Sequence, residues 1–148
     1  MNLVIVESPT KARTLGRFLG DDYQIEASMG HVRDLPENKL GIDLDHDFAP
    51  EYVVSAKKEA VVKDLQAKAK KADLVILATD PDREGEAISW HISTLIQKSK
   101  GKSLQRITFH EITEPAIKDA LAHPGTINMQ LVDAQQARRI LDRLVGYK

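Results

Sequence analysis

The stretch Leu74–His91, LVILATDPDREGEAISWH, decides the expected fold of this chain. It opens with the continuous apolar run Leu74–Ala78, which is typical of a strand buried on both faces of a parallel sheet. Asp80 and Pro81 then supply a helix N-cap and a first helical residue, and we expect a helix from about Asp82 to Gln97. The stretch therefore predicts a strand, a short acidic turn and a helix.

The same pattern opens the chain. Leu3–Val6 is a short apolar run rich in β-branched residues, and Ser8 followed by Pro9 marks a helix that we expect to end at Gly20. Further strands are expected at Tyr23–Ser28 and Arg106–Phe109, further helices at Lys57–Lys71 and Glu114–Ala122, and a polar loop at Gln97–Ser103. This alternation predicts an α/β fold with a mainly parallel sheet flanked by helices.

A long helix of different character follows. We expect it at Asn128–Val145, with one apolar face made by Leu131, Ala134, Ala137, Leu141 and Val145. It also carries Arg138, Arg139 and Arg143, with Asp142 one turn after Arg138. Residues 134–148 hold four basic and one acidic side chain, net +3, whereas the other 133 residues hold 17 basic and 21 acidic, net −4. A local basic helix suits a nucleic-acid backbone, although a solvated helix face has the same composition.

Length and composition limit the classes of protein further. A chain of 148 residues can bury a core, and 42% apolar residues argue against disorder. The net charge of −1 excludes a uniformly basic nucleic-acid coat. The absence of cysteine excludes disulfides, thiolate metal sites and a cysteine nucleophile. The first apolar run is too short for a signal peptide, and no segment approaches the roughly 20 apolar residues that cross a bilayer, so we expect a cytoplasmic protein.

Acidic residues follow two of the expected strands. Glu7 comes directly after Leu3–Val6, and Asp80 follows Leu74–Ala78 by two residues. In open α/β sheets the ligand crevice lies at the carboxyl ends of the strands, so neighbouring strands would bring Glu7 and Asp80 together. Asp80 also starts an alternating series, which would share one side of an extended segment: Asp80, Asp82, Glu84 and Glu86. Such acids repel one another without a cation, and hard oxygen ligands predict Mg²⁺.

Most of these acids also have a structural explanation. Asp80 suits an N-cap, and Asp82 and Glu84 suit an acidic first turn that complements the helix dipole. Glu7, at the end of a different strand, needs no such cap. Lys11 lies in a first helical turn, where the dipole disfavours a cation, so it indicates either a bound phosphate or a solvated lysine.

The loop Gly30–Leu35 supplies a further cation and a titratable group. Arg33 and His31 are candidates for contact with a phosphate, and a simple Arg33–Asp34 contact is the alternative. The other histidines show no metal-ligand spacing. We expect His91 to be a packing or hydrogen-bonding residue, and the remaining three, His46, His110 and His123, to lie at the surface.

Five motifs occur in order along the chain. They are ESPTKA at Glu7–Ala12, GHVRDLP at Gly30–Pro36, TDPDREGEAISWH at Thr79–His91, FHEIT at Phe109–Thr113 and LVDAQQARRILDRLVGY at Leu131–Tyr147. Together they resemble the Toprim domain of bacterial DNA topoisomerase I, a type IA topoisomerase, over nearly the whole chain. The ESPTK form of the first motif favours this family over topoisomerase III.

The resemblance implies an enzyme of the bacterial nucleoid that cuts one DNA strand, holds the 5′ end on a tyrosine, passes another strand and rejoins the cut. Such enzymes relax negative supercoils with Mg²⁺ and without ATP. The implied catalytic and metal-binding set is Glu7, Asp80, Asp82 and Glu84, with Glu7 handling the proton of the 3′ hydroxyl. The implied DNA or phosphate contacts are Lys11, His31, Arg33, Arg138, Arg139 and Arg143.

The resemblance also divides the chain into residues 1–124, the Toprim domain, and residues 125–148, the start of an adjoining helical DNA-binding domain. The family's nucleophilic tyrosine lies downstream of all these motifs, and Tyr147 only ends the last helix. We therefore expect a monomer that binds Mg²⁺ and DNA weakly and does not relax DNA alone. The alternatives are a Toprim primase or nuclease, a Mg²⁺-dependent phosphatase with Asp80 as nucleophile, and a non-catalytic interaction module.

Overall fold

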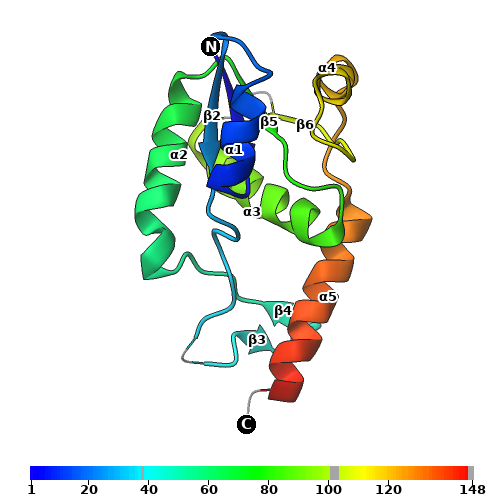
Figure 1. Ribbon diagram of the computed structural model, residues 1–148. Helices are drawn as coiled ribbons and strands as arrows, with labels where there is room; N and C mark the ends of the chain where they lie inside the picture. The colour runs from blue at the N-terminus through cyan, green and yellow to red at the C-terminus, as the bar shows by residue number, and fades with distance from the viewer. Residues whose placement is uncertain (38, 101–103, 147–148) are drawn as a thin grey trace.

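A four-stranded parallel sheet organises the computed structural model, which describes residues 1–37, 39–100 and 104–146. The strands are β1 (Asn2–Val6), β2 (Tyr23–Ala27), β5 (Leu74–Leu77) and β6 (Leu104–Arg106), in the order β2-β1-β5-β6 (Figure 1). Every neighbouring pair is parallel. The predicted α/β class with a mainly parallel sheet is confirmed.

Helices cover both faces of this sheet. On one face, α2 (Glu59–Lys71) and α3 (Arg83–Lys100) pack against Leu3, Ile5, Val75 and Leu77. On the other face, α1 (Pro9–Gly16) and α4 (Glu114–Ala122) pack against Val4, Val6 and Ile76. Because side chains alternate between the faces of a strand, both sets along β1 are buried, which explains its continuous apolar run.

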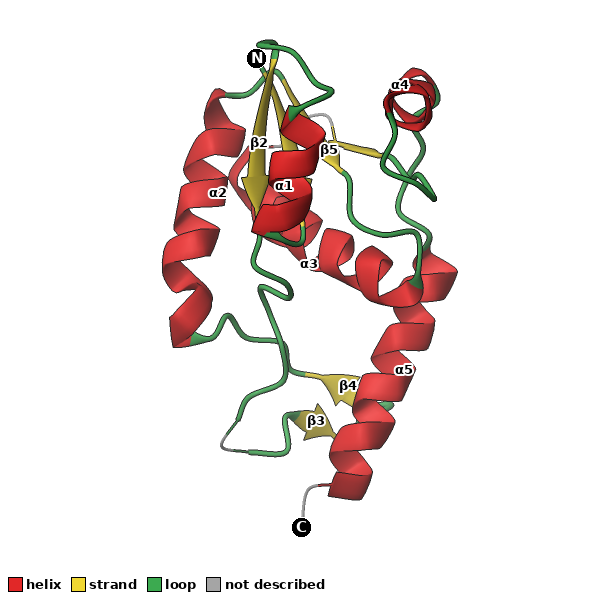
Figure 2. Cartoon of the chain, in the orientation of Figure 1, coloured by secondary structure: helices red, strands yellow, loops and turns green. Residues whose placement is uncertain are grey.

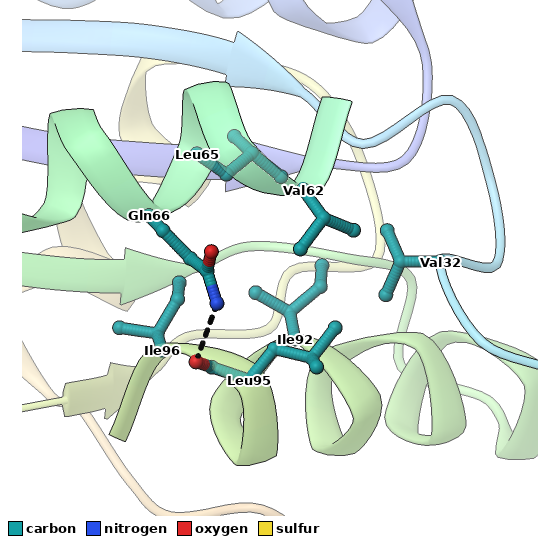
Figure 3. Close-up of a pocket in the computed structure, with 7 residues that line it drawn as sticks. All are labelled: Val32, Val62, Leu65, Gln66, Ile92, Leu95 and Ile96. Carbon is teal, nitrogen blue, oxygen red and sulfur yellow. Dashed lines mark hydrogen bonds between the residues drawn. The ribbon is translucent and has the colours of Figure 1, made fainter. Parts of the chain in front are cut away.

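The interface between α2 and α3 is filled by apolar side chains and one hydrogen bond. Figure 3 shows Gln66 of α2 reaching across to α3, where its amide nitrogen donates to the carbonyl of Leu95 at 3.1 Å. The cavity among these side chains measures only about 10 Å³, room for no more than one water molecule. This region is therefore part of the core and holds no ligand.

The strand order fixes where a ligand site belongs. The chain leaves β1 for β2 on one side and returns to β5 on the other side of β1, so the sheet changes its direction of winding between β1 and β5. The helices that follow these two strands, α1 and α3, lie on opposite faces. In open α/β sheets, ligands bind outside the carboxyl ends of the strands at such a switch point.

A second layer of structure extends from the carboxyl edge of the sheet. It contains a two-stranded hairpin, β3 (Ile42–Asp43) and β4 (Ala49–Pro50), the short 3₁₀ helix η1 (Ala56–Lys58) and the long helix α5 (Met129–Gly146). Figure 2 shows α5 running from the N-terminal part of α3 down beside the hairpin. No helix within the described residues is long and apolar enough to cross a membrane.

Two predicted boundaries near the sheet were wrong. α1 ends at Gly16 rather than Gly20, because Phe18 and Leu19 turn back to bond the carbonyl of Leu15 and pack against the core from outside the helix. The last strand is Leu104–Arg106 rather than Arg106–Phe109, because its partner β5 ends at Leu77. Ile107 and Phe109 remain buried after the strand has ended, so their alternating apolar side chains resemble those of a strand in the sequence.

The two longest helices also differ from expectation. α3 continues to Lys100, so the first part of the expected polar loop is helical, since Gln and Lys are good helix formers. Residues 101–103 of that loop lie outside the described residues. On α5 the apolar face is exposed, with Leu141 at 56% and Val145 at 68%, whereas Val132 and Gln135 are buried. The helix packs on α3 through its other side.

Candidate active site at the carboxyl edge of the sheet

Glu7 and Asp80 meet at the switch point. β1 and β5 are neighbours, and each of these acids follows the end of its strand. Oε2 of Glu7 accepts a hydrogen bond from the backbone N–H of Asp80 at 2.8 Å. The expectation that neighbouring strands bring the two acids to one crevice is therefore confirmed by direct contact.

Lys11 is the third member of this cluster. Its Nζ lies 3.0 Å from Oε1 of Glu7 and 3.0 Å from Oδ1 of Asp80. Only 8% of the residue is exposed, and its ammonium group lies 5.1 Å from the centre of the Phe109 ring. A solvated surface lysine is excluded, because the first turn of α1, capped by Ser8, holds this cation inside the site.

Oε1 of Glu7 has an unusual environment. It is buried and, within the described residues, forms an ion pair with the ammonium group of Lys11 at 3.0 Å but receives no aligned hydrogen bond. A buried oxygen without a hydrogen-bond donor is costly unless another group satisfies it. Among the described groups only the charge of Lys11 satisfies this oxygen, so it can still accept a hydrogen bond or a proton.

The acidic series after β5 does not lie along one extended segment, and that expectation was wrong. Oδ1 of Asp82 accepts the N–H of Gly85 at 2.7 Å, so Asp82 caps α3. Glu84, in the first turn, meets His31 at 3.2 Å. Glu86 turns inward and is only 2% exposed. The expected N-cap at Asp80 was therefore wrong: α3 starts at Arg83, so Asp82 is its cap, while Asp80 stays at the edge with Glu7.

Gly85 allows the acidic turn to fold tightly over the start of α3. A Cβ at this position would lie 1.9 Å from the carbonyl oxygen of Asp80. Because that atom belongs to the backbone, the turn itself would have to move. We expect Gly85→Ala to destabilise the chain by about 2–4 kcal/mol in urea unfolding. Gly20→Ala is the matched control, since nothing lies within 4 Å of its Cβ position, and equal losses in the two variants would contradict this assignment.

His31 and Arg33 leave the sheet edge for a cluster of aromatic rings. Nε of Arg33 donates to Nδ1 of His91 at 2.9 Å, and the guanidinium lies 5.4 Å from the ring centre of Tyr52 and 5.1 Å from that of Trp90. The alternative of an Arg33–Asp34 contact was wrong. His91 is the packing and hydrogen-bonding residue that was expected, and burial, aided by the charge of Arg33, lowers its pKa to about 3.

The buried His91 makes the stability of the chain depend on pH. Its pKa is lower in the folded chain than the ordinary 6.5, so the unfolded chain binds more protons between these values, and stability falls as the pH falls through this window. Between pH 6.5 and 5 we expect His91 to account for a loss of about 2 kcal/mol. The difference in unfolding free energy between wild type and His91→Gln, measured in urea, should shrink by this amount as the pH falls from 6.5 to 5. A difference that stays constant with pH would contradict the assignment.

The arginines of α5 divide between two roles. Arg139 forms a double hydrogen bond to Asp34, at 2.9 and 3.1 Å, and Arg143 donates to the carbonyls of Pro36, Lys39 and Leu40. Burial alone would raise the pKa of Asp34, but the hydrogen bonds from Arg139 and from the backbone hold it below its ordinary value. Arg138 is exposed and meets Asp142 at 3.2 Å, the pairing expected from their spacing. Arg139 and Arg143 thus fasten α5 to the loop that carries His31 and Arg33.

Two surface hollows flank the carboxylates. One of about 390 Å³ is lined by Asp80, Asp82 and the segment 109–112, which carries the FHEI residues. The other, of about 300 Å³, extends from Glu84 and His31 to Arg138 and Arg139 on α5. The first hollow thus opens beside Asp80 and Asp82, and the second brings Glu84, His31 and Arg33 together with the arginines of α5.

The four predicted metal ligands are not gathered around one point. Among the described residues, no three His, Asp or Glu side chains form a group that could hold a metal ion. The carboxylate of Asp80 faces Lys11, and that of Glu84 faces His31. Each of these two carboxylates thus has a basic side chain of the chain itself as its partner.

Arg106 is the residue that sequence reasoning missed. It ends β6, is 3% exposed, and its guanidinium donates to the carbonyls of Leu77, Thr79, Asp80 and Ile107. It also pairs with the buried Glu86 at 2.8 Å. The sequence did contain a signal for it, namely a charged residue between Leu104 and the apolar residues Ile107 and Phe109. Its bonds hold the backbone that presents Asp80.

Fold and site together define an α/β domain that places carboxylates and a buried lysine at the ligand-binding edge of a parallel sheet. Comparison with protein-family models gives the particular family. The model of the Toprim domain matches residues 2–112, and the chain belongs to the Toprim family.

A solved structure extends the likeness beyond residue 112. The chain is 50% identical to full-length topoisomerase I from Thermotoga maritima, with a TM-score of 0.90. The match covers 98% of this chain and 24% of that one, so the chain spans about a quarter of the length of the topoisomerase. The likeness therefore includes α5 as well as the sheet.

Proposed function

We propose that this chain is the metal- and DNA-handling part of a type IA DNA topoisomerase. Such an enzyme breaks one DNA strand by transesterification, passes a second strand and rejoins the first, and it relaxes negative supercoils without ATP. The observation that carries the proposal is the contact among Glu7, Lys11 and Asp80 at the switch point of the sheet. The likeness to topoisomerase I across α5 favours this enzyme over a Toprim primase or nuclease, which should lack the arginine helix.

Mg²⁺ is the proposed cofactor, held by carboxylates from the set Glu7, Asp80, Asp82 and Glu84. The residues fit this ion in their chemistry, because all the donors are hard carboxylate oxygens. Bound there, Mg²⁺ would stabilise negative charge on the reacting phosphate.

Glu7 is the proposed proton carrier. Its Oε2 is fixed by the N–H of Asp80, which leaves Oε1 to take the proton of a DNA 3′ hydroxyl on rejoining and to return one on cleavage. Lys11, whose charge lies 3.0 Å from both carboxylates, is placed to bind the phosphate between them. Both groups are held by the backbone of β1 and by the first turn of α1.

The hollow between the sheet edge and α5 is the proposed path of a DNA single strand. Arg138, Arg33 and His31 line it and supply positive or titratable groups for the phosphates. Arg139 and Arg143 act mainly by fastening the helix to the segment 34–40. We assign residues 1–124 to the Toprim domain and residues 125–148 to the start of a DNA-binding domain in the same polypeptide, and we propose that the chain works in the cytoplasm as a monomer.

The described tyrosines do not suit the role of nucleophile. The hydroxyl of Tyr52 is buried without a described hydrogen-bond partner, and burial raises its pKa to about 12. Tyr23 starts β2, at the opposite end of the sheet from Glu7. Tyr147 lies outside the described residues. The proposed reaction uses a tyrosine from another part of the enzyme, as the resemblance to type IA topoisomerases implies.

Two measurements on the purified chain test this function. In NMR titrations with MgCl₂, the amide resonances of Glu7, Asp80 and Asp82 should shift while those of α4 stay constant. Negatively supercoiled plasmid incubated with the chain and Mg²⁺ should remain supercoiled. A chain whose site amides do not respond to Mg²⁺ would be a non-catalytic module, and relaxation of the plasmid would contradict the assignment of the nucleophile to another part of the enzyme.

A further inference from the structure

A buried ion pair lies behind the acidic turn, away from the proposed substrate. Arg106 and Glu86 are 3% and 2% exposed, and the guanidinium approaches Oε1 of Glu86 at 2.8 Å. Burying two charges costs several kcal/mol each, and well-packed apolar side chains often stabilise a core equally well. Stability alone is therefore a weak explanation for this pair, and its other contacts indicate a role.

The contacts of Arg106 converge on the segment that carries Asp80. Nη1 donates to the carbonyls of Leu77 and Thr79 at 3.2 and 2.7 Å, and Nη2 donates to the carbonyl of Asp80 at 2.8 Å. Since Glu7 holds the N–H of Asp80, both peptide groups of this residue are fixed. The direction of the Asp80 side chain thus depends on Arg106.

The second oxygen of Glu86 reaches a different part of the molecule. Oε2 accepts the backbone N–H of Asn128 at 2.8 Å. The side chain of Asn128 in turn accepts the N–H groups of Gln130 and Leu131 and caps the start of α5. One carboxylate therefore connects the start of the arginine helix with the guanidinium that fixes Asp80.

We propose that Glu86 and Arg106 are positioning residues that set the acidic turn and α5 in one fixed relation. Arg106 holds the backbone of Asp80, and Glu86 holds both Arg106 and Asn128. The direction in which α5 starts at Asn128 then determines where the arginines of that helix lie. The proposal rests on the proposed function in one respect only, namely that this relation aligns the metal-binding carboxylates with the DNA strand. The mechanical link itself is independent of metal and DNA.

The link is tested by the direction of α5 in conservative variants. Glu86→Gln keeps the shape of the side chain but cannot accept from both Arg106 and Asn128 with full charge, and Arg106→Lys keeps the charge but cannot reach all the carbonyls. The chain has no cysteine, so spin labels on cysteines introduced at the exposed positions Lys63 of α2 and Leu141 of α5 report one distance. We expect this distance distribution to broaden at least twofold in both variants.

A matched control separates positioning from folding. Glu114→Gln breaks an exposed ion pair on α4 and should leave the distance distribution sharp. Hydrogen exchange should become at least tenfold faster at the amide of Asn128 in Glu86→Gln, while the amides of Val4 and Ile5 in β1 change less than twofold. If Glu86→Gln does not fold, Arg106→Lys carries the test.

Two outcomes would overturn the proposal: an unchanged distance distribution in the folded variants, or exchange that accelerates equally at Asn128 and in β1. Either would leave the pair a role in stability alone. Failure of the metal assignment would instead appear in the wild-type chain, as site amides that do not respond to MgCl₂, and it would leave the distance measurement valid. The two failures are thus distinguishable.

Discussion

Replacing Asp80 and Asp82 together with asparagine in the complete enzyme that carries this chain should lower relaxation of supercoiled plasmid roughly a thousandfold or more. Asparagine keeps the size of each side chain, and an amide oxygen at position 82 can still accept the N–H of Gly85. What the double variant loses is two negative charges at the switch point, one of which faces Lys11. Time courses of plasmid relaxation at several Mg²⁺ concentrations measure the effect.

The control for this prediction lies on α4. Glu114 and Asp119 are exposed acids on that helix, and Glu114→Gln together with Asp119→Asn removes the same charge at a distance from the switch point. We expect this control to relax plasmid within about twofold of wild type, since surface substitutions away from special contacts have small effects. Activity of the Asp80/Asp82 variant close to that of the control would leave the two acids as structural residues only.

The part of this site that the sequence predicts is the part fixed by local rules. A continuous apolar run is typical of a strand buried on both faces, and β1 and β5 are such strands. Parallel neighbours end at the same edge, so Glu7 and Asp80 meet once the pairing is correct. The two acids at that edge could be identified from the sequence because they closely follow the two apolar runs.

The part that could not be predicted depends on contacts between distant segments. Glu86 has the same chemistry and spacing as Asp82 and Glu84, yet it lies on the inner side of α3, where it pairs with Arg106, 20 residues later in the chain. The apolar residues of α5 predict a buried face, but Arg139 and Arg143 bond to the segment 34–40 and turn the opposite side inward. Periodicity defines a face of a helix, and the partners of the other residues decide whether it is buried.

Lys11 supplies the acidic edge with a cation of its own. Its ammonium group lies 3.0 Å from carboxylate oxygens of both Glu7 and Asp80, almost out of contact with water. A cation in this position partly neutralises the site and also repels a second cation, because two positive charges about 4 Å apart interact by several kcal/mol near a protein surface. The lysine therefore opposes Mg²⁺ while it prepares a place for the phosphate.

Lys11→Met should accordingly bind Mg²⁺ about tenfold more tightly while the complete enzyme loses at least about a hundredfold in relaxation, since the phosphate contact disappears. Calorimetric titration of the chain and plasmid relaxation by the enzyme measure the two effects. Without Mg²⁺ the variant should melt below wild type, because Glu7 loses its only described cationic partner, and added Mg²⁺ should raise its melting temperature more than that of wild type.

Lys11→Arg separates charge from shape in the same experiment. It keeps the positive charge beside both carboxylates, so its Mg²⁺ affinity should stay within about twofold of wild type, whereas the planar guanidinium fits the space over Phe109 differently and should lower relaxation. If Met and Arg at this position gave the same Mg²⁺ affinity as lysine, the metal would lie outside the reach of the ammonium group. Glu7 and Asp80, both within 3.0 Å of that group, would then have to be removed from the metal-binding set.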